Sequence, residues 1–359
     1  MSNISGLRIG IVGCGAISHY HGRAAQESDL GIRFPACCDL REEVVRQWAH
    51  TYGCDSWYTD YEEMVHKEEL DVILLATWPN QHREQIEQCL AMGVKNLLCE
   101  KALCLKGQEA LEIYEMVGKA GAFLMEGFMY RHHPATRKIE ELLLGGKHGT
   151  IDSIRAHFSH FEAETATVDD TSRNWRQRKE CGGGVPYDFA CYCVNTCNHF
   201  APSLPRRVFA SGSISPKYDT ITRLYALIEY EGGQVGLVES SNGAASSQEL
   251  QVICAHGRLT LPVSWTIMDD VVIDECSATG WVAYEHAEHR IAQADAYQLQ
   301  MENLAAVVHE GSEPRLPLEE SVLNTFTLEA LVNSLLENHP VDVAIPDAIR
   351  EATNARNEE

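Results

Sequence analysis

A glutamate and a lysine stand where an apolar strand is expected to end. The run "VKNLLCEKALCL" is apolar as far as Cys99, and Glu100 and Lys101 follow it directly. Buried charges are costly, so two charged residues at the end of a buried strand need a physical reason. A lysine amine can exchange a proton with a substrate, or it can simply pair with the neighbouring carboxylate. Both interpretations of Lys101 remain open at this point.

A second group of residues has the spacing of a phosphate-binding turn. In "RIGIVGCGAIS", Gly13, Gly15 and Ser18, the last in place of a third glycine, follow an apolar strand and open a helix. Gly13 permits a tight turn, Gly15 lets the backbone approach a pyrophosphate, and the free N–H groups of the helix start favour an anion. The motif therefore predicts a dinucleotide site, with Gly13, Gly15, Ala16 and Ile17 as the cofactor-binding residues of the turn.

The next two strand ends carry further candidates. Asp39 closes "FPACCD", where a carboxylate accepts hydrogen bonds from ribose hydroxyls and repels a 2′-phosphate, whereas Arg41 suits a 2′-phosphate. We expect NAD, with NADP as the alternative; the other interpretation of Asp39 is a cap of the following helix. The third element, "ATWPNQH", places Thr77, Pro79 and His82 beyond a strand end, where ligands of doubly wound sheets bind. For His82 alone, capping or packing is the alternative.

The elements that position these residues alternate up to about Gly127. They are "LRIGIVG", a helix from Ala16, "IRFPACCD", a helix from Arg41, "DVILLAT", a helix from His82, "VKNLLCE", a helix from Gly107 and "AFLMEG". This alternation is typical of a parallel sheet with right-handed crossovers and helices on both faces. It predicts an α/β Rossmann domain with a doubly wound parallel sheet at residues 1–128.

The rhythm changes after Pro134. "TIDSIRAHFSHF" has period two, and "TITRLYALIEYEGGQVGLVES" and "ELQVICAHGRLTLP" indicate hairpins that turn at 231–233 and 256–257. Two late helices are expected at about 294–309 and about 318–338. We therefore expect an α+β domain at 129–359 with a large, mostly antiparallel sheet that is open on one face.

Composition and charge argue against several functional classes. The 359 residues are 45% hydrophobic and 23% charged, as in ordinary globular proteins, and the formal net charge is −23. That acidic excess argues against nucleic acid as a partner, because such binding depends on clustered Lys and Arg. No apolar run approaches the roughly 18 residues of a membrane span, and the N-terminus lacks a signal-peptide pattern. We expect a cytoplasmic protein without a membrane partner.

The cysteines raise the question of a metal site. Thirteen is an odd number without a disulfide pattern, which indicates reduced thiols. A group suggestive of zinc consists of Cys181, Cys191, Cys193, Cys197 and His199. Because the group lacks CxxC pairs and falls in a predicted helix, we expect no metal and treat the cysteines as small buried apolar side chains.

Five stretches together resemble one enzyme family. "GIVGCGAIS", "ATWPNQH", "LLCEKAL", "EGFMYRHHP" and "CGGGVPYDFACYCVN" occur in the order and spacing of the glucose–fructose oxidoreductase / inositol dehydrogenase (Gfo/Idh/MocA) family, over nearly the whole chain. The resemblance is nearest to the glucose–fructose oxidoreductase and dihydrodiol or xylose dehydrogenase group. It implies an NAD(P)-dependent oxidoreductase that transfers hydride between nicotinamide and a hydroxyl or keto carbon of a sugar, glycoside or polyol.

The resemblance also implies catalytic residues. Relatives carry Glu-Lys-Pro with the lysine near nicotinamide and the reacting hydroxyl, which matches Glu100 and Lys101, although Ala102 replaces the proline. An Asp and, four residues on, a His or Tyr match Asp188 and Tyr192, which would share one helix face. Lys101, Tyr192 and Asp188 are thus the expected catalytic group. From spacing alone, Asp188 could equally favour the helix dipole and Tyr192 could be core packing.

Other segments are implied to border the ligands. Tyr130 and Arg131 match a segment that lines the family's cleft, and Trp175 and Arg176 match one beside nicotinamide and substrate; a buried tryptophan and a surface arginine are the alternatives. Two other functions remain open: a redox-neutral enzyme that recycles tightly bound NAD, including oxidation-assisted glycoside cleavage, and a non-catalytic sensor of dinucleotide or sugar. Relatives also imply a homo-oligomer, dimer or tetramer, formed through the C-terminal sheet.

Overall fold

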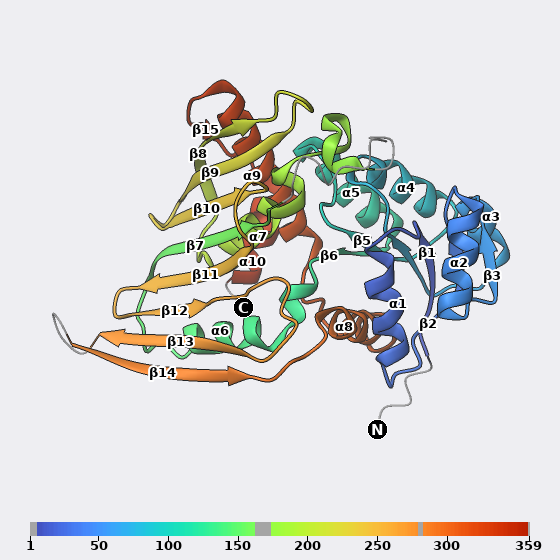
Figure 1. Ribbon diagram of the computed structural model, residues 1–359, viewed down its shortest axis with the longest axis horizontal. Coiled ribbons are helices and arrows are strands. Elements are labelled where there is room, and N and C mark those ends of the chain that lie inside the picture. Colours follow the sequence, from blue (N-terminus) through green and yellow to red (C-terminus); the bar gives the residue numbers. More distant parts are fainter. Residues whose placement is uncertain (1–5, 162–173, 279–282, 358–359) are drawn as a thin grey trace. The chain divides into compact units, whose positions relative to one another are not determined.

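The computed structural model describes residues 6–161, 174–278 and 283–357 and divides the chain into two compact units (Figure 1). The first unit contains residues up to 104, then 109–132 and 295–318. The second contains 105–108, 133–294 and the residues from 319 onward. The expected domains, 1–128 and 129–359, stay a prediction.

The first unit is built on a six-stranded parallel sheet in the order β3-β2-β1-β4-β5-β6 (Figure 1). Its strands are β1 (Arg8–Val12), β2 (Arg33–Cys38), β3 (Ser56–Tyr58), β4 (Val72–Leu75), β5 (Asn96–Glu100) and β6 (Phe123–Gly127). Its helices are α1 (Ser18–Glu27), α2 (Glu42–Tyr52), α3 (Tyr61–Lys67), α4 (Pro79–Ala91), α5 (Gly107–Ala120) and α8 (Ala296–Glu310). The strands are nearly continuous in apolar residues because helices cover both faces of such a sheet. The predicted doubly wound parallel sheet is confirmed.

The second unit is built on a nine-stranded sheet in the order β14-β13-β12-β11-β7-β10-β9-β8-β15. Its strands are β7 (Ile151–Ser159), β8 (Pro205–Ile214), β9 (Ile221–Tyr230), β10 (Val235–Ser241), β11 (Ser247–Cys254), β12 (Gly257–Leu261), β13 (Val271–Ala278), β14 (Tyr284–Ile291) and β15 (Val341–Asp342). Its helices are α6 (Pro134–Leu144), α7 (Cys191–Phe200), α9 (Leu318–Glu337) and α10 (Asp347–Asn357). Within this sheet, β7 and β10 are the only described strands that pair in parallel, so the mostly antiparallel sheet is confirmed.

One face of the second sheet is covered by α7. A Cβ added to Gly236 of β10 would contact Cβ of Cys197 in α7 at 3.3 Å, so this strand position faces the helix. Because side chains alternate along a strand, the neighbouring Leu237 points to the opposite face. On that face Phe209 and Tyr225 are 41% and 48% exposed, so part of the apolar surface there is open to solvent.

Several element boundaries differ from the predictions. The first helix begins at Ser18 rather than Ala16, and the helix expected from His82 begins at Pro79, since proline suits the first helical turn. The short pair β3 and α3 was not predicted, because three residues are too few to show a strand period. The second hairpin turns at Ala255 and His256, one residue before the expected turn.

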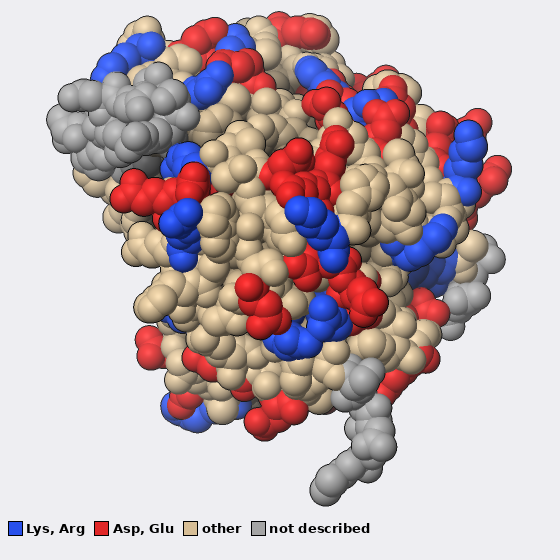
Figure 2. All heavy atoms as spheres, turned by 90° about the vertical axis from the view of Figure 1, so that its right-hand side faces the viewer, with Lys and Arg blue, Asp and Glu red and all other residues tan. Residues whose placement is uncertain are grey.

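Two surface properties bear on partners. Among the described residues, no helix combines the length and the apolar character that crossing a membrane requires. Figure 2 shows one face of the protein, on which Lys and Arg side chains lie among Asp and Glu side chains and form no continuous basic area. The expectation that nucleic acid is not a partner stays a prediction.

Candidate active site

Four predicted site residues leave the first sheet at one edge. Val12 of β1 pairs with Cys38 of β2 and with Leu75 of β4, and Leu75 pairs with Cys99 of β5. Because these strands are parallel, the segments that follow them emerge together, where ligands of such sheets bind. In spatial order, the residues at this edge are Asp39, Gly13, Thr77 and Lys101.

The glycine turn leaves room for a phosphate group. Gly13 has φ of +96°, and a Cβ there would lie 2.6 Å from the carbonyl oxygen of Ala76, so only glycine fits. A Cβ on Gly15 would meet no atom of the described chain within 4 Å beyond its neighbours. The turn continues through exposed Ala16 and half-buried Ile17 into α1. This open space before a helix N-terminus fits the pyrophosphate of a dinucleotide.

Replacing Gly15 with valine is expected to remove dinucleotide binding without unfolding the protein. The new side chain fills the open space before the turn, so we expect NAD to bind about 100-fold or more weakly, with an unchanged melting temperature. Calorimetric titration with NAD measures the affinity, and thermal melting measures the stability. Gly13→Val is the matched control, because it should lower stability itself. Wild-type affinity in Gly15→Val would contradict the assignment of this turn.

Asp39 is fixed by the glycine turn and by Arg41. Its carboxylate accepts hydrogen bonds from the backbone N–H of Cys14 at 3.0 Å and of Arg41 at 2.9 Å. The Arg41 guanidinium lies 3.1 Å away, and its hydrogen bond to Asp39 raises the pKa of Arg41. Arg41 itself occupies the N-cap position of α2, without a side-chain cap, so the interpretation of Asp39 as that cap is wrong. The carboxylate of Asp39 and the guanidinium of Arg41 therefore lie together beside the glycine turn.

His82 holds together the two loops that carry Thr77 and Lys101. It is fully buried in α4, with Nδ1 3.1 Å from the carbonyl oxygens of Ala102 and Leu103 and Nε2 3.2 Å from that of Thr77. Burial lowers the pKa of His82 in spite of these carbonyl contacts. These contacts give His82 a structural role inside the protein, which is the alternative that the sequence left open. Pro79 is buried at the start of the same helix, and Thr77 Oγ1 donates to Gln85 at 2.6 Å.

The lowered pKa of His82 predicts a loss of stability on acidification. Below the ordinary pKa of 6.5 the unfolded chain takes up a proton that the folded chain resists, so stability falls as the pH drops through this value toward the folded pKa. In His82→Gln the slope of unfolding free energy against pH below 6.5 should be flatter, by up to about 1.4 kcal/mol per pH unit. Urea unfolding at several pH values measures it. His50→Gln, at an exposed position of α2, should leave the slope unchanged.

Glu100 anchors the strand end from which Lys101 emerges. Its Oε1 lies 2.7 Å from Nε2 of His21 in α1, and its Oε2 accepts the backbone N–H of Lys101 at 3.2 Å. Glu100 and His21 are 4% and 0% exposed. The ring of Tyr297 in α8 meets the His21 ring edge-on at 5.2 Å, and burial, with the charge of Glu100, raises the pKa of Tyr297 well above its ordinary value. Lys101 itself is half-buried.

Glu126 fixes the loop on the other side of Lys101. It is the last residue but one of β6, is 1% exposed, and its Oε1 accepts the backbone N–H of Leu103 at 2.8 Å. The peptide bond between Lys101 and Ala102 in this loop is cis. The backbone around Lys101 is thus tied to buried side chains on both sides.

Tyr130 and Arg131 are both buried in the short 3₁₀ helix Met129–His132. The Tyr130 ring packs edge-on against Phe128 at 6.1 Å, and Arg131 donates to the carbonyl oxygen of Arg315 at 3.3 Å. Both contacts lie within the first unit. Their expected contact with ligand stays a prediction.

In the second unit, Arg176 and Asp188 form a two-pronged ion pair. Nε of Arg176 lies 2.6 Å from Oδ2 of Asp188, and Nη2 lies 3.2 Å from Oδ1. The Asp188 side chain is 6% exposed, so a paired carboxylate is the form that burial tolerates. The guanidinium also stacks over the ring of Trp175 at 5.0 Å. The structure therefore brings three of the predicted site residues into one cluster.

The glycine run is what lets this cluster form. A Cβ on Gly183 would lie 2.7 Å from the carbonyl oxygen of Arg178 and 2.8 Å from that of Arg176. The N–H groups of Gly183 and Gly184 bond to these same two carbonyls at 2.8 and 2.9 Å. The run therefore folds back on the loop that carries Trp175 and Arg176, which larger residues would prevent.

The helix that carries Asp188 and Tyr192 is not regular. Residues Pro186–Ala190 form a π-helical turn in which the N–H of Cys191 reaches the carbonyl of Pro186, and α7 follows. The expectation of one regular helix is wrong here, because Asp188 lies in the wider turn and Tyr192 in α7. Such turns are frequent at functional sites. Tyr192 is 6% exposed and its ring lies 5.6 Å from that of Phe158, so packing is part of its role.

The cysteines of this region are buried thiols. Cys181, Cys191, Cys193 and Cys197 are each at most 2% exposed, and burial raises the pKa of Cys193 and Cys197. Among the described residues, no group of three or more His, Cys, Asp or Glu has a geometry that could hold a metal ion.

Three residues near the site escaped the sequence analysis. Glu126 carries the same signal as Glu100, a charge at the end of an apolar strand, and was overlooked. His21 showed only as a polar residue within a helix, and Tyr297 reaches the first unit from a distant part of the chain. For both residues, the sequence around the position does not indicate which side chains it contacts in the fold.

Comparisons with known proteins agree with this geometry. Residues 7–128 match the profile described as the Gfo/Idh/MocA oxidoreductase family, NAD-binding Rossmann fold, and residues 136–260 match the Gfo/Idh/MocA C-terminal domain. The chain is 28% identical to D-xylose 1-dehydrogenase (NADP(+)) 2 of Haloferax volcanii, over 80% of this chain and 84% of the relative. It is 30% identical to trans-1,2-dihydrobenzene-1,2-diol dehydrogenase of Mus musculus, over 75% of this chain and 78% of the relative.

The fold is also that of solved structures. A 3-ketoreductase from Actinomadura kijaniata, solved with NADP and TDP-benzene, superposes with a TM-score of 0.81 at 20% identity, over 92% of this chain and 98% of that one. At this identity the likeness concerns the fold alone. With both domains matched in sequence, the chain belongs to the Gfo/Idh/MocA family of NAD(P)-dependent oxidoreductases.

Proposed function

We propose that this enzyme oxidises a hydroxyl group of a sugar, glycoside or polyol, or reduces the corresponding ketone, with NAD as cofactor and NADP as the alternative. The observation that carries the proposal is the row of Asp39, Gly13, Thr77 and Lys101 at one edge of the parallel sheet. A turn that accepts phosphate and a lysine that can exchange a proton thus share one edge. The names of the relatives, xylose and dihydrodiol dehydrogenases, support hydroxyl-bearing substrates.

The proposed chemistry divides between cofactor and protein. Nicotinamide, when bound, accepts or gives the hydride at its C4 atom. Lys101 takes the hydroxyl proton through its amine, and Tyr192 shares or relays that proton through its phenol. Asp188 orients the reacting hydroxyl as an acceptor. Its pair with Arg176 balances the charge of a carboxylate that is only 6% exposed.

The cofactor contacts follow from the same edge. The pyrophosphate would be bound by the turn of Gly13, Gly15, Ala16 and Ile17. The adenosine ribose would be bound by Asp39 and Arg41. The part of the cofactor nearer to nicotinamide would be bound by Thr77 and Pro79. His82 acts by holding the loops, and Glu100 by holding the start of Lys101. Tyr130, Arg131, Trp175 and Arg176 are proposed to border the ligands. Residues 1–128 thus bind the dinucleotide and 129–359 the substrate.

A panel of aldoses, glycosides and polyols tests the function. Purified protein is incubated with NAD or NADP, and absorbance of the reduced nicotinamide is followed. A dehydrogenase accumulates free NADH with at least one class of substrate. Conversion of substrate without free NADH would indicate a recycled, bound cofactor. Binding of dinucleotide and sugar without any conversion would contradict catalysis and leave a sensor.

We propose that the open face of the second sheet pairs with another copy of the chain. Phe209 of β8 lies beside Leu227 of β9, which lies beside Leu237 of β10, so apolar side chains form a row across three strands. Placing a charge in a buried, apolar interface is costly, so Phe209→Asp should shift a dimer or tetramer toward monomer. Light scattering after size exclusion measures the mass; a monomeric wild type would contradict the proposal.

A further inference from the structure

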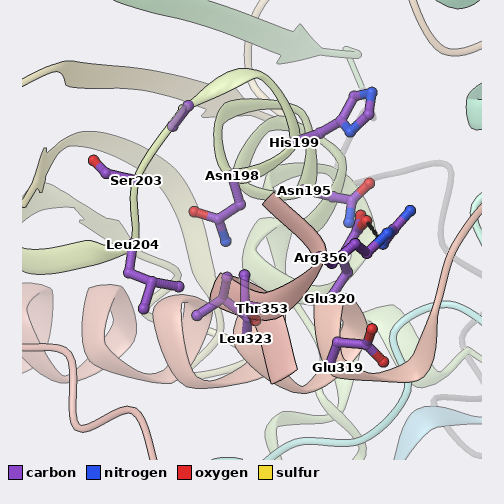
Figure 3. A pocket seen from close by; sticks show the side chains of 11 residues that line it. Asn195, Asn198, His199, Ser203, Leu204, Glu319, Glu320, Leu323, Thr353 and Arg356 are labelled. Atoms are coloured by element: carbon purple, nitrogen blue, oxygen red, sulfur yellow. Dashed lines mark hydrogen bonds and ion pairs between the residues drawn. The ribbon is translucent and has the colours of Figure 1, made fainter. Parts of the chain in front are cut away.

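A polar pocket lies within the second unit at the far end of α7 from Asp188. It has a volume of about 220 Å³ and is bounded by the last turns of α7, the loop after it, the start of α9 and the end of α10 (Figure 3). The volume is below the roughly 300–1,000 Å³ of sites for drug-sized ligands. This volume suits a ligand of about monosaccharide size.

Two hydrogen bonds within the protein fix the orientation of the Asn198 side chain in the pocket wall. The Asn198 amide oxygen accepts a hydrogen bond from the hydroxyl of Tyr230 at 2.9 Å, and its NH₂ donates to Thr327 at 3.3 Å. Tyr230 is fully buried, and burial raises its pKa well above the ordinary value, so its hydroxyl remains a donor. Each end of the amide retains one further hydrogen-bonding position. Asn198 can therefore both donate to and accept from a ligand.

The charges of the pocket decide which ligand suits it. Arg356 and Glu320 pair at 2.5 Å and compensate each other. Glu319, in the first turn of α9, has no ion pair with any residue that the structure describes. An anion would meet the charge of Glu319. A neutral ligand with several hydroxyls can donate to Glu319 and accept from Asn198 and Arg356.

Apolar side chains complete the lining. Leu204 and Leu323 are 2% and 4% exposed and contribute to the pocket wall (Figure 3). Sugars and polyols present C–H groups beside their hydroxyls, so they suit a wall that combines directed polar groups with aliphatic carbon. We propose that this pocket binds a neutral polyhydroxylated molecule of monosaccharide or hexitol size, at a second site distinct from the proposed catalytic residues.

A pocket-filling variant tests the proposal. Thr353 of α10 is half-buried and lines the pocket, so Thr353→Tyr places a ring in it, whereas Asn354→Tyr places the same ring at an exposed position of the same helix. Each protein, saturated with NADH to prevent oxidation, is titrated with sorbitol and with myo-inositol by calorimetry. Thermal melting checks folding. Glu319→Gln is a second variant that removes only the charge.

The expected result is a polyol site that is present in the wild type and in Asn354→Tyr. Binding at this site should be at least tenfold weaker in Thr353→Tyr and measurably weaker in Glu319→Gln. Identical titrations in all four proteins, or no polyol binding by the wild type, would overturn the proposal. Binding of ethylammonium without any polyol binding would also overturn it, in favour of a cation site. Turnover measured in the same variants is independent, so failure of the proposed oxidoreductase activity would be recognised separately.

Discussion

Lys101→Ala is expected to lower kcat by about 100-fold to 10,000-fold while leaving dinucleotide binding unchanged. General acid–base groups typically contribute this much, and the alanine removes only the amine that exchanges the hydroxyl proton. The fold should persist, since the backbone around residue 101 is held by Glu100, Glu126 and His82 rather than by the lysine side chain. Steady-state rates with the best substrate of the panel, beside NAD titration, measure both quantities.

Two further measurements make the result specific to the amine. Lys106→Ala, which removes a lysine exposed on the same loop and paired with Glu329 at 3.2 Å, should leave kcat unchanged. Added alkylamines should restore part of the rate in Lys101→Ala and none in the wild type. Full activity in Lys101→Ala would remove the amine from the mechanism.

Asp188→Asn is expected to reduce kcat/KM by about 100-fold, mainly through kcat. The asparagine keeps the shape of the side chain but no longer accepts at both oxygens from Arg176, and the amide orients a hydroxyl less strongly than a carboxylate. A purely structural role would instead lower the melting temperature and leave kcat near the wild-type value. Rates over a range of pH and thermal melting separate these cases.

A neighbouring ion pair is the control for Asp188. Arg178 and Glu180 pair at 2.8 Å in the same loop, with side chains 35% and 65% exposed. Arg178→Gln should therefore change both stability and rate little. If Arg178→Gln lowered kcat as much as Asp188→Asn, the loop as a whole, rather than the carboxylate, would be responsible.

Much of the first unit could be predicted because its signals are local. The turn of Gly13 and Gly15, and the acids and lysine at strand ends, are each set by a few neighbouring residues, and parallel strands then bring their ends to one edge. The same rule applied to "AFLMEG" would have singled out Glu126. The sequence therefore predicted that the strand ends bind the cofactor. Of the two buried acids that hold the loop of Lys101, it predicted Glu100 and missed Glu126.

The rest depends on contacts between distant segments. Tyr297 packs on His21 across more than two hundred residues, and His82 reaches the carbonyls of Ala102 and Leu103, which no periodicity encodes. The π-helical turn at Asp188 arises at the junction of the glycine run with α7, where helix propensity says nothing about a wider turn. The pair of Arg176 with Asp188 likewise depends on the folded glycine run.

Transfer of deuterium from substrate to cofactor tests the central claim most directly. The sugar or polyol selected by the panel carries deuterium on the carbon of the reacting hydroxyl, and the reduced nicotinamide is recovered from the protein and analysed by NMR. The account predicts deuterium at C4 in the wild type, even when the cofactor stays bound, and far slower labelling in Lys101→Ala. Product formed at the normal rate with no deuterium reaching the nicotinamide would contradict it.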